Sequence, residues 1–161
     1  MRRIAAAAAL LLLAACDSAG PAAPAVVESP APSATAASCA AGVPSRVLPE
    51  WARTGFSDPN PAMPYVLGDR GDIVAIVFGY PLRAPSQPDR SNKILWVSRV
   101  SQEPASPLVI DARLDGGGDP VTREVSGGAG PSIVDLPAAG CWHLQLTWSG
   151  HTDTLRLTYE R

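Results

Sequence analysis

Residues 39–161 are predicted to fold as one all-β domain, an antiparallel β-sandwich. Thirteen prolines and thirteen glycines interrupt residues 40–161, so few segments are long enough for a helix of ordinary length. Apolar runs of strand length lie between these breakers, and turn-forming residues separate the runs. Short strands that recur about every ten to twelve residues are typical of an antiparallel sandwich.

The first half of the domain contains one segment with a clear strand signature. Residues 72–78, Asp-Ile-Val-Ala-Ile-Val-Phe, are apolar on both faces and rich in β-branched side chains. They are expected to form a central strand. A short strand is expected before it at 46–48. Residues 54–63, rich in Gly, Asp, Asn and Pro, are expected to form a loop.

Four further strands are expected along the middle of the chain, at 93–99, 108–114, 121–125 and 132–136. In 108–114 apolar residues alternate with polar ones, which gives this strand a core face and a solvent face. The glycine-rich segments 116–120 and 127–131 are the turn signals that separate the last three.

The last two strands, 141–148 and 153–159, form the clearest hairpin of the chain. Apolar side chains alternate along both strands, which gives the hairpin one apolar face. A four-residue loop at 149–152 would place Leu146 opposite Leu155. A two-residue Ser149-Gly150 turn would instead place Leu146 opposite Asp153. We predict the four-residue loop because its register pairs more apolar side chains.

Ahead of this domain, residues 1–15 have the order of a secretory signal. Arg2 and Arg3 precede an apolar run at 4–15, which is too short to cross a bilayer as a helix of about 20 residues. Leu13-Ala14-Ala15-Cys16 resembles the lipobox of bacterial lipoproteins. The resemblance implies cleavage before Cys16, lipidation of its thiol, and anchoring on the extracytoplasmic face of the cell membrane. An ordinary signal peptide or an uncleaved anchor is the alternative.

Residues 16–38 would then link the lipid to the domain. Ala, Pro and Ser dominate this segment and it holds no aromatic residue, so it is expected to be disordered. Cleavage would remove two of the 13 basic residues and none of the 15 acidic ones, leaving 11 against 15 and a net charge of −4. This acidic balance argues against nucleic acid as a partner and leaves contact with the membrane to the lipid.

The two remaining cysteines, Cys39 and Cys141, would lie in an oxidising compartment. An even pair in such a setting predicts a structural disulfide between them. A reactive pair or a metal site is the alternative, but no CxxC spacing and no histidine cluster supports either one.

The segment Ala138-Ala139-Gly140-Cys141-Trp142 resembles the entry to the F strand of immunoglobulin-like domains. The resemblance covers this segment and the hairpin that follows, and it implies an immunoglobulin-like sandwich. In that family the cysteine points into the core, whereas the alternation here places Cys141 on the polar face. This difference favours a bridge from Cys141 to the incoming segment at Cys39 over a bridge between the sheets.

The residue types of catalytic and metal sites are present without the spacing of such sites. His143 and His151 lie on opposite faces in one hairpin register and about 16 Å apart in the other. Ser149, His151 and Asp153 lie on one turn, whereas a catalytic triad is assembled across a fold. A calcium site is equally unsupported, because no EF-hand spacing joins the loop residues Asp58, Asn60, Asp69 and Asp72. We expect no metal, no cofactor and no enzymatic activity.

Trp51 is the aromatic residue best suited to a binding surface, because it precedes the loop at 54–63. An exposed Trp51 could stack on a sugar or hold a partner protein, and the alternative is that it caps the open end of the sandwich. The leading functional hypothesis is a non-catalytic binding or accessory module that contacts another envelope protein through loops at the end of the sandwich. A small-ligand or metal-binding lipoprotein is the second hypothesis, and an envelope enzyme is the third.

Overall fold

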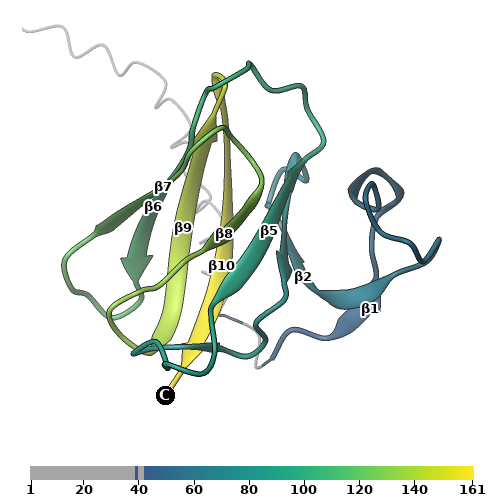
Figure 1. The fold of residues 1–161 in the computed structure, drawn as a ribbon. Helices are drawn as coiled ribbons and strands as arrows, with labels where there is room; N and C mark the ends of the chain where they lie inside the picture. Colours follow the sequence, from purple (N-terminus) through teal and green to yellow (C-terminus); the bar gives the residue numbers. More distant parts are fainter. Residues whose placement is uncertain (1–38, 40–41) are drawn as a thin grey trace, which may run out of the picture. The chain divides into compact units, whose positions relative to one another are not determined.

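The structure is a computed structural model that describes residue 39 and residues 42–161. The predicted signal peptide, the lipidation site Cys16 and the whole predicted linker lie outside the described residues. Two five-stranded sheets pack together (Figure 1). Apart from one short 3-10 helix, η1 (Glu50–Ala52), every regular element of the described part is a strand. The predicted all-β sandwich is therefore confirmed.

The first sheet contains β1 (Ser45–Val47), β2 (Ala62–Leu67), β3 (Ile73–Val77), β5 (Lys93–Ser98) and β8 (Pro131–Ile133), in that order. All pairs within it are antiparallel. Strand β3 lies in the middle, and its five residues are all buried. This is the central strand that the apolar run at 72–78 predicted.

The second sheet contains β4 (Leu82–Arg83), β10 (His151–Glu160), β9 (Gly140–Trp148), β6 (Leu108–Leu114) and β7 (Val121–Val125), in that order. Three of its pairs are antiparallel, but β4 runs parallel to β10 with Leu82 beside Tyr159. The expectation of a purely antiparallel sandwich is wrong at this edge. Only residues 78–81 separate β3 from β4, so the chain passes from one sheet to the other without a hairpin.

The order of the strands is that of an immunoglobulin-like sandwich. Strands β3, β5 and β8 correspond to A, B and E of one sheet, and β10, β9, β6 and β7 correspond to G, F, C and C′ of the other. The short β4 continues β3 onto the second sheet beside β10. The hairpin of β1 and β2 widens the first sheet beyond β3.

Two strands, β2 and β4, were not predicted. Strand β2 begins inside the segment expected to be a loop, and it contains Pro64, which has no N–H to donate to a neighbouring strand. Pro64 lies at the edge of the pairing, because the register of β2 with β3 begins at Tyr65 and Pro64 pairs with Ser45, the first residue of the short strand β1. Strand β4 has two residues, too few to show any alternation of apolar and polar positions.

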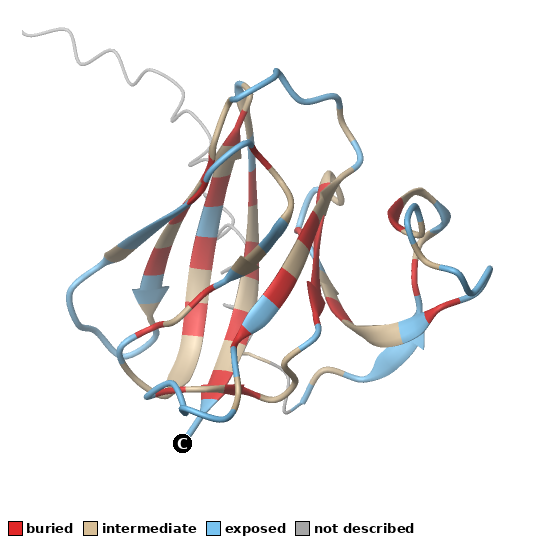
Figure 2. Cartoon of the chain, viewed as in Figure 1, coloured by how far each residue is buried: buried red, intermediate tan, exposed pale blue. Residues whose placement is uncertain are grey.

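The main core lies between the two sheets, where buried residues alternate with more exposed ones along β9 and β10 (Figure 2). Its largest side chains are three tryptophans and one tyrosine. Their polar ring groups donate hydrogen bonds to Ser132 Oγ (from Trp96, 3.0 Å), Ala138 O (from Trp142, 2.9 Å), Ser98 Oγ (from Trp148, 3.0 Å) and Val134 O (from Tyr159, 2.7 Å). These bonds remove the cost of burying the polar ring groups.

The register of the final hairpin differs from the prediction. Strands β9 and β10 are joined by a two-residue turn, Ser149-Gly150, so Leu146 lies opposite Asp153 and not opposite Leu155. Both turn residues have positive φ, 45° and 76°, as in the tight hairpin turns that match the twist of the strands. Asp153 is 1% exposed in this register, and its carboxylate accepts backbone hydrogen bonds that the sequence pattern did not indicate.

Candidate functional site

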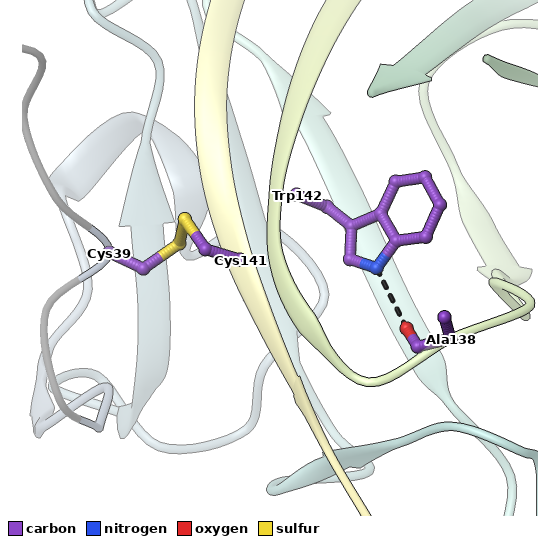
Figure 3. Close-up of a disulfide and its surroundings, with 4 residues drawn as sticks. All are labelled: Cys39, Ala138, Cys141 and Trp142. Atoms are coloured by element: carbon purple, nitrogen blue, oxygen red, sulfur yellow. Dashed lines mark hydrogen bonds between the residues drawn. A yellow bond between two sulfur atoms is a disulfide. The ribbon is translucent and has the colours of Figure 1, made fainter. Parts of the chain in front are cut away.

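The disulfide attaches the start of the domain to the second sheet. Cys39 and Cys141 are bonded, with their Cα atoms 5.7 Å apart and a sequence separation of 102. Figure 3 shows that Cys141 and Trp142 point to opposite sides of β9, so the bridge lies outside the core that Trp142 fills. The structure therefore contains the predicted disulfide, and Cys141 lies on the polar face of its strand. In immunoglobulin domains, by contrast, the corresponding cysteine points into the core.

The outer face of the first sheet is apolar, which is unusual for the solvent side of an antiparallel sheet. Strand pairing places ten apolar side chains on it, and we call them the outer apolar face: Met63, Tyr65, Leu67, Val74, Ile76, Phe78, Leu95, Val97, Pro131 and Ile133. The opposite side chains of the same strands, such as Ile73, Ala75 and Trp96, belong to the main core. Both faces of this sheet are therefore apolar.

The segment between β1 and β2 covers part of this face. Leu48 and Ala52 are buried against Tyr65, Val74 and Ile76, and form a second hydrophobic cluster with them. The coil of η1 lies on the side of the sheet that faces away from β9 and β10 (Figure 1). Phe56, further along the segment, stacks on Phe78 with ring centroids 6.2 Å apart.

Trp51 is half-buried and packs against this second cluster. It lies over the outer face of the first sheet, so it does not cap the open end of the sandwich. The residue singled out from the sequence thus borders the outer apolar face without being its centre.

The cover leaves the two margins of the outer apolar face open to solvent. Leu67 on β2 is 40% exposed, Phe78 at the end of β3 is 44% exposed, and Ile133 on β8 is 61% exposed. Leu95 and Val97 are only half-buried on β5 between these margins. An apolar surface that a folded chain leaves uncovered is a candidate for contact with another molecule.

Two cations are the only charged residues on the strands of the first sheet in the described part of the chain. The Arg46 guanidinium lies 4.7 Å from the centroid of the Tyr65 ring, and Lys93 Nζ lies 5.4 Å from that of Phe78. Each cation is thus held against an aromatic ring of the outer apolar face by a cation–π contact. Both charges that the strands contribute to this face are therefore positive.

Sequence reasoning missed the outer apolar face, although the signal for it was present. Residues 73–77 and 94–97 are apolar at consecutive positions, and the first run was interpreted as a central strand and the second only as a strand. In an antiparallel sandwich only one face of each sheet meets the other sheet. A run that is apolar at every position therefore also indicates a second covered or binding face.

The two histidines and the residues considered as a catalytic triad lie in different surroundings and do not come together in one site. His143 is on the outer face of the second sheet, whereas the His151 ring lies 5.8 Å from that of Trp148. Ser149 Oγ accepts a hydrogen bond from the Glu103 N–H, and the Asp153 carboxylate faces the backbone of residues 70 and 72. The described residues contain no group of three or more His, Cys, Asp or Glu side chains that could hold a metal ion.

Each acidic loop residue considered for calcium has its own hydrogen-bond or ion-pair partner. Asp58 Oδ1 accepts the Asn60 N–H at 2.8 Å, Asp69 Oδ2 accepts the Thr154 hydroxyl at 2.5 Å, and Asp72 pairs with Arg99 at 3.1 Å. These contacts fix turns and the ends of strands. They do not bring the carboxylates together.

A small cleft of about 270 Å³ lies beside the disulfide, between β2 and β10. Cys39 and Val43 line one side, Leu67 lies on β2, and Leu155 and Thr158 lie on β10. The charged side chains of Arg46, Asp69 and Arg156 also line this cleft.

Comparison with protein-family models, with curated proteins and with solved structures finds no match to this chain. A search of the described residues for a helix long and apolar enough to cross a membrane finds none.

Proposed function

We propose that this protein is a lipid-anchored, extracytoplasmic binding module that docks another envelope protein on its outer apolar face. The observation that supports the proposal is the apolar outer side of the first sheet, which its own cover leaves partly exposed at Leu67, Phe78 and Ile133. Burying such a surface against a partner is the main favourable term in protein association.

The docking surface differs from the one that the sequence suggested. Loops at the end of the sandwich were expected to make the contact, with Trp51 as the anchor. Trp51 is half-buried in the second cluster, whereas Ile133 is 61% exposed. We therefore assign the contact to the face of β5 and β8, with Phe78 at its border.

The charges on this face specify the chemistry of the partner. Lys93 projects between Phe78 and Ile133, since it pairs with Ile133 and lies over the Phe78 ring. A complementary surface would carry apolar side chains flanked by carboxylates, which would satisfy the ammonium group as it loses water. The partner is thus a protein with an apolar, acidic patch.

The lipid anchor rests on the resemblance of Leu13-Ala14-Ala15-Cys16 to a lipobox. Labelling of the host cells with a palmitate analogue should mark the wild-type protein and recover it with the membranes. Cys16→Ser should abolish the label and release the protein from the membrane fraction. A Cys16→Ser protein that stays with the membranes would contradict the anchor.

The docking proposal is tested by site-specific photocrosslinking in intact host cells. A benzoylphenylalanine probe at Ile133 should give one discrete adduct with a second protein, and the crosslinked segment should contain apolar and acidic residues. The same probe at Glu124, exposed on the second sheet, should give no such adduct. Lys93→Glu should abolish the adduct at position 133, while Arg161→Glu, with the same change in charge at the exposed C-terminus, should leave it intact.

Three results would overturn this docking site. An adduct of twice the mass of the chain would assign the face to a second copy, and an adduct with phospholipid alone would assign it to the membrane. An adduct that forms equally from positions 133 and 124 would show contact without a specific face.

A further inference from the structure

The outer face of the second sheet carries a row of three basic side chains. Arg113 on β6 lies directly opposite His143 on β9, and His143 lies directly opposite Arg156 on β10. Side chains that face one another across adjacent strands have Cβ atoms about 5 Å apart. Arg113 and Arg156 therefore lie on either side of His143, and Arg156 also lines the cleft beside the disulfide.

This basic row has no carboxylate partner in the described part of the chain. The two ion pairs found there join Arg83 to Glu160 and Arg99 to Asp72. Neither Arg113 nor Arg156 is in an ion pair or a side-chain hydrogen bond there. The two guanidinium groups carry like charges on neighbouring positions of one face, so a bound anion would offset the repulsion between them.

A hollow of about 430 Å³ opens beside the row on the same face. It is lined by Asp111, Arg113, Pro120, Thr122, His143 and Gln145. Asp111 Oδ1 accepts the Thr122 hydroxyl at 2.6 Å, which leaves Oδ2 free of protein hydrogen bonds among the described residues. Gln145 is exposed and lies opposite Asp111. The floor of the hollow therefore joins cationic donors at one end to a carboxylate and an amide at the other.

We propose that this hollow binds an acidic sugar. The anionic group of the sugar would lie on Arg113, which lines the hollow, because a guanidinium group binds a carboxylate in a bidentate manner, and Arg156 would approach it from beyond His143. Its hydroxyl groups would donate to Asp111 and bond to Gln145. This binding site goes beyond the protein-docking function, since it lies on the other sheet and uses none of the same residues.

The arrangement favours a sugar acid over a simple anion. The carboxylate of Asp111 repels a compact anion that fills the hollow, but it stabilises a ligand that presents hydroxyl groups at that end. A neutral sugar satisfies Asp111 and Gln145 yet leaves the basic row without a counter-charge. Only a molecule with both features matches the whole floor.

The test is isothermal titration calorimetry on the full chain in detergent micelles, with galacturonate, galactose and inorganic phosphate as probes. Galacturonate should bind with saturation, at least tenfold more tightly than either galactose or phosphate. Arg113→Gln and Arg156→Gln should each weaken galacturonate binding at least tenfold. Arg99→Gln removes the same charge just beyond the end of β5 in the first sheet, and it should change the affinity less than twofold.

Asp111→Asn separates recognition of the sugar hydroxyls from attraction of the anion. This change should weaken galacturonate relative to phosphate, because an acceptor for hydroxyls is lost while a negative charge is removed. Equal affinity for galacturonate and phosphate, an equal loss in Arg99→Gln, or no binding of galacturonate to a folded wild-type chain would each overturn the proposal.

Discussion

The carboxylate of Asp153 occupies the space that a side chain at Gly68 would need. A Cβ atom built on Gly68 would lie 2.1 Å from Asp153 Oδ2. The carboxylate there accepts backbone N–H groups from Arg70 (2.9 Å), Asp72 (3.1 Å) and Thr154 (2.8 Å). A buried charge is tolerated because its oxygen atoms are satisfied, and the turn between β2 and β3 is thereby held against β10.

Gly68→Ala should lower the free energy of unfolding by about 2–3 kcal/mol. The added methyl group must displace either the turn or the carboxylate, which strains packing and leaves buried polar groups unsatisfied. Urea unfolding followed by tryptophan fluorescence measures the change. Arg70→Ala in the same turn keeps the backbone donors and should cost less than 0.5 kcal/mol, by the usual behaviour of exposed sites. A Gly68→Ala protein as stable as wild type would contradict the packing described.

The faces of the final hairpin could be predicted from the sequence, but its register could not. Alternation with a period of two assigns Trp142 and Leu157 to the core in either register. The choice between registers depended on whether Asp153 could be buried, and that was decided by backbone donors at 70 and 72, more than 80 residues away. A local pattern carries no information about such partners.

Some features of the candidate sites could likewise be predicted from the sequence, and others could not. The pairing of Cys39 with Cys141 followed from the number of cysteines, and the polar-face position of Cys141 followed from alternation along β9. The outer apolar face depends on how much of it the segment before β2 covers, and the basic row depends on the pairing of β6, β9 and β10. Both are properties of tertiary packing, so neither is a motif in the sequence.

Removal of the disulfide should destabilise the domain by about 2–5 kcal/mol, because the bond closes a loop of about a hundred residues in the unfolded chain. The bond spans 102 residues, which is almost the whole domain. Cys39→Ala/Cys141→Ala and the wild-type protein should be compared in guanidinium chloride with and without a phosphine reductant. The reductant should lower the midpoint of the wild type alone. An equal effect on both proteins would show that the stabilisation comes from elsewhere.

The stability of the domain should fall as the pH rises above about 10, in part through Tyr159. Burial raises the pKa of the Tyr159 phenol, and the nearby Asp135 carboxylate raises it further, while Arg123 acts in the opposite direction. Above the ordinary tyrosine pKa the unfolded chain loses this proton and the folded chain keeps it, so the free energy of unfolding decreases by about 1.4 kcal/mol per pH unit.

Tyr159→Phe isolates this contribution. At neutral pH the variant should be about 1–2 kcal/mol less stable than wild type, because the Val134 carbonyl loses its donor. Between pH 10 and 11.5 the difference should shrink, since phenylalanine has no proton to lose on unfolding. Urea unfolding across this range measures both slopes. Two parallel curves would show that the Tyr159 hydroxyl has the same pKa in both states.

The Ser149-Gly150 turn should depend on Gly150 for its conformation. Gly150 has φ +76°, and a Cβ built there meets no atom within 4 Å, so any cost of Gly150→Ala arises from the left-handed backbone alone. That cost is about 1–2 kcal/mol for an L-residue.

Gly130 is the matched control, because its φ lies outside the left-handed region and a Cβ atom built on it would lie 3.9 Å from the nearest atom. Gly130→Ala should therefore be neutral or slightly stabilising. Differential scanning calorimetry of both variants should show a lower melting temperature for Gly150→Ala only. Equal melting temperatures would show that the backbone at Gly150 carries no cost and would contradict the left-handed turn described.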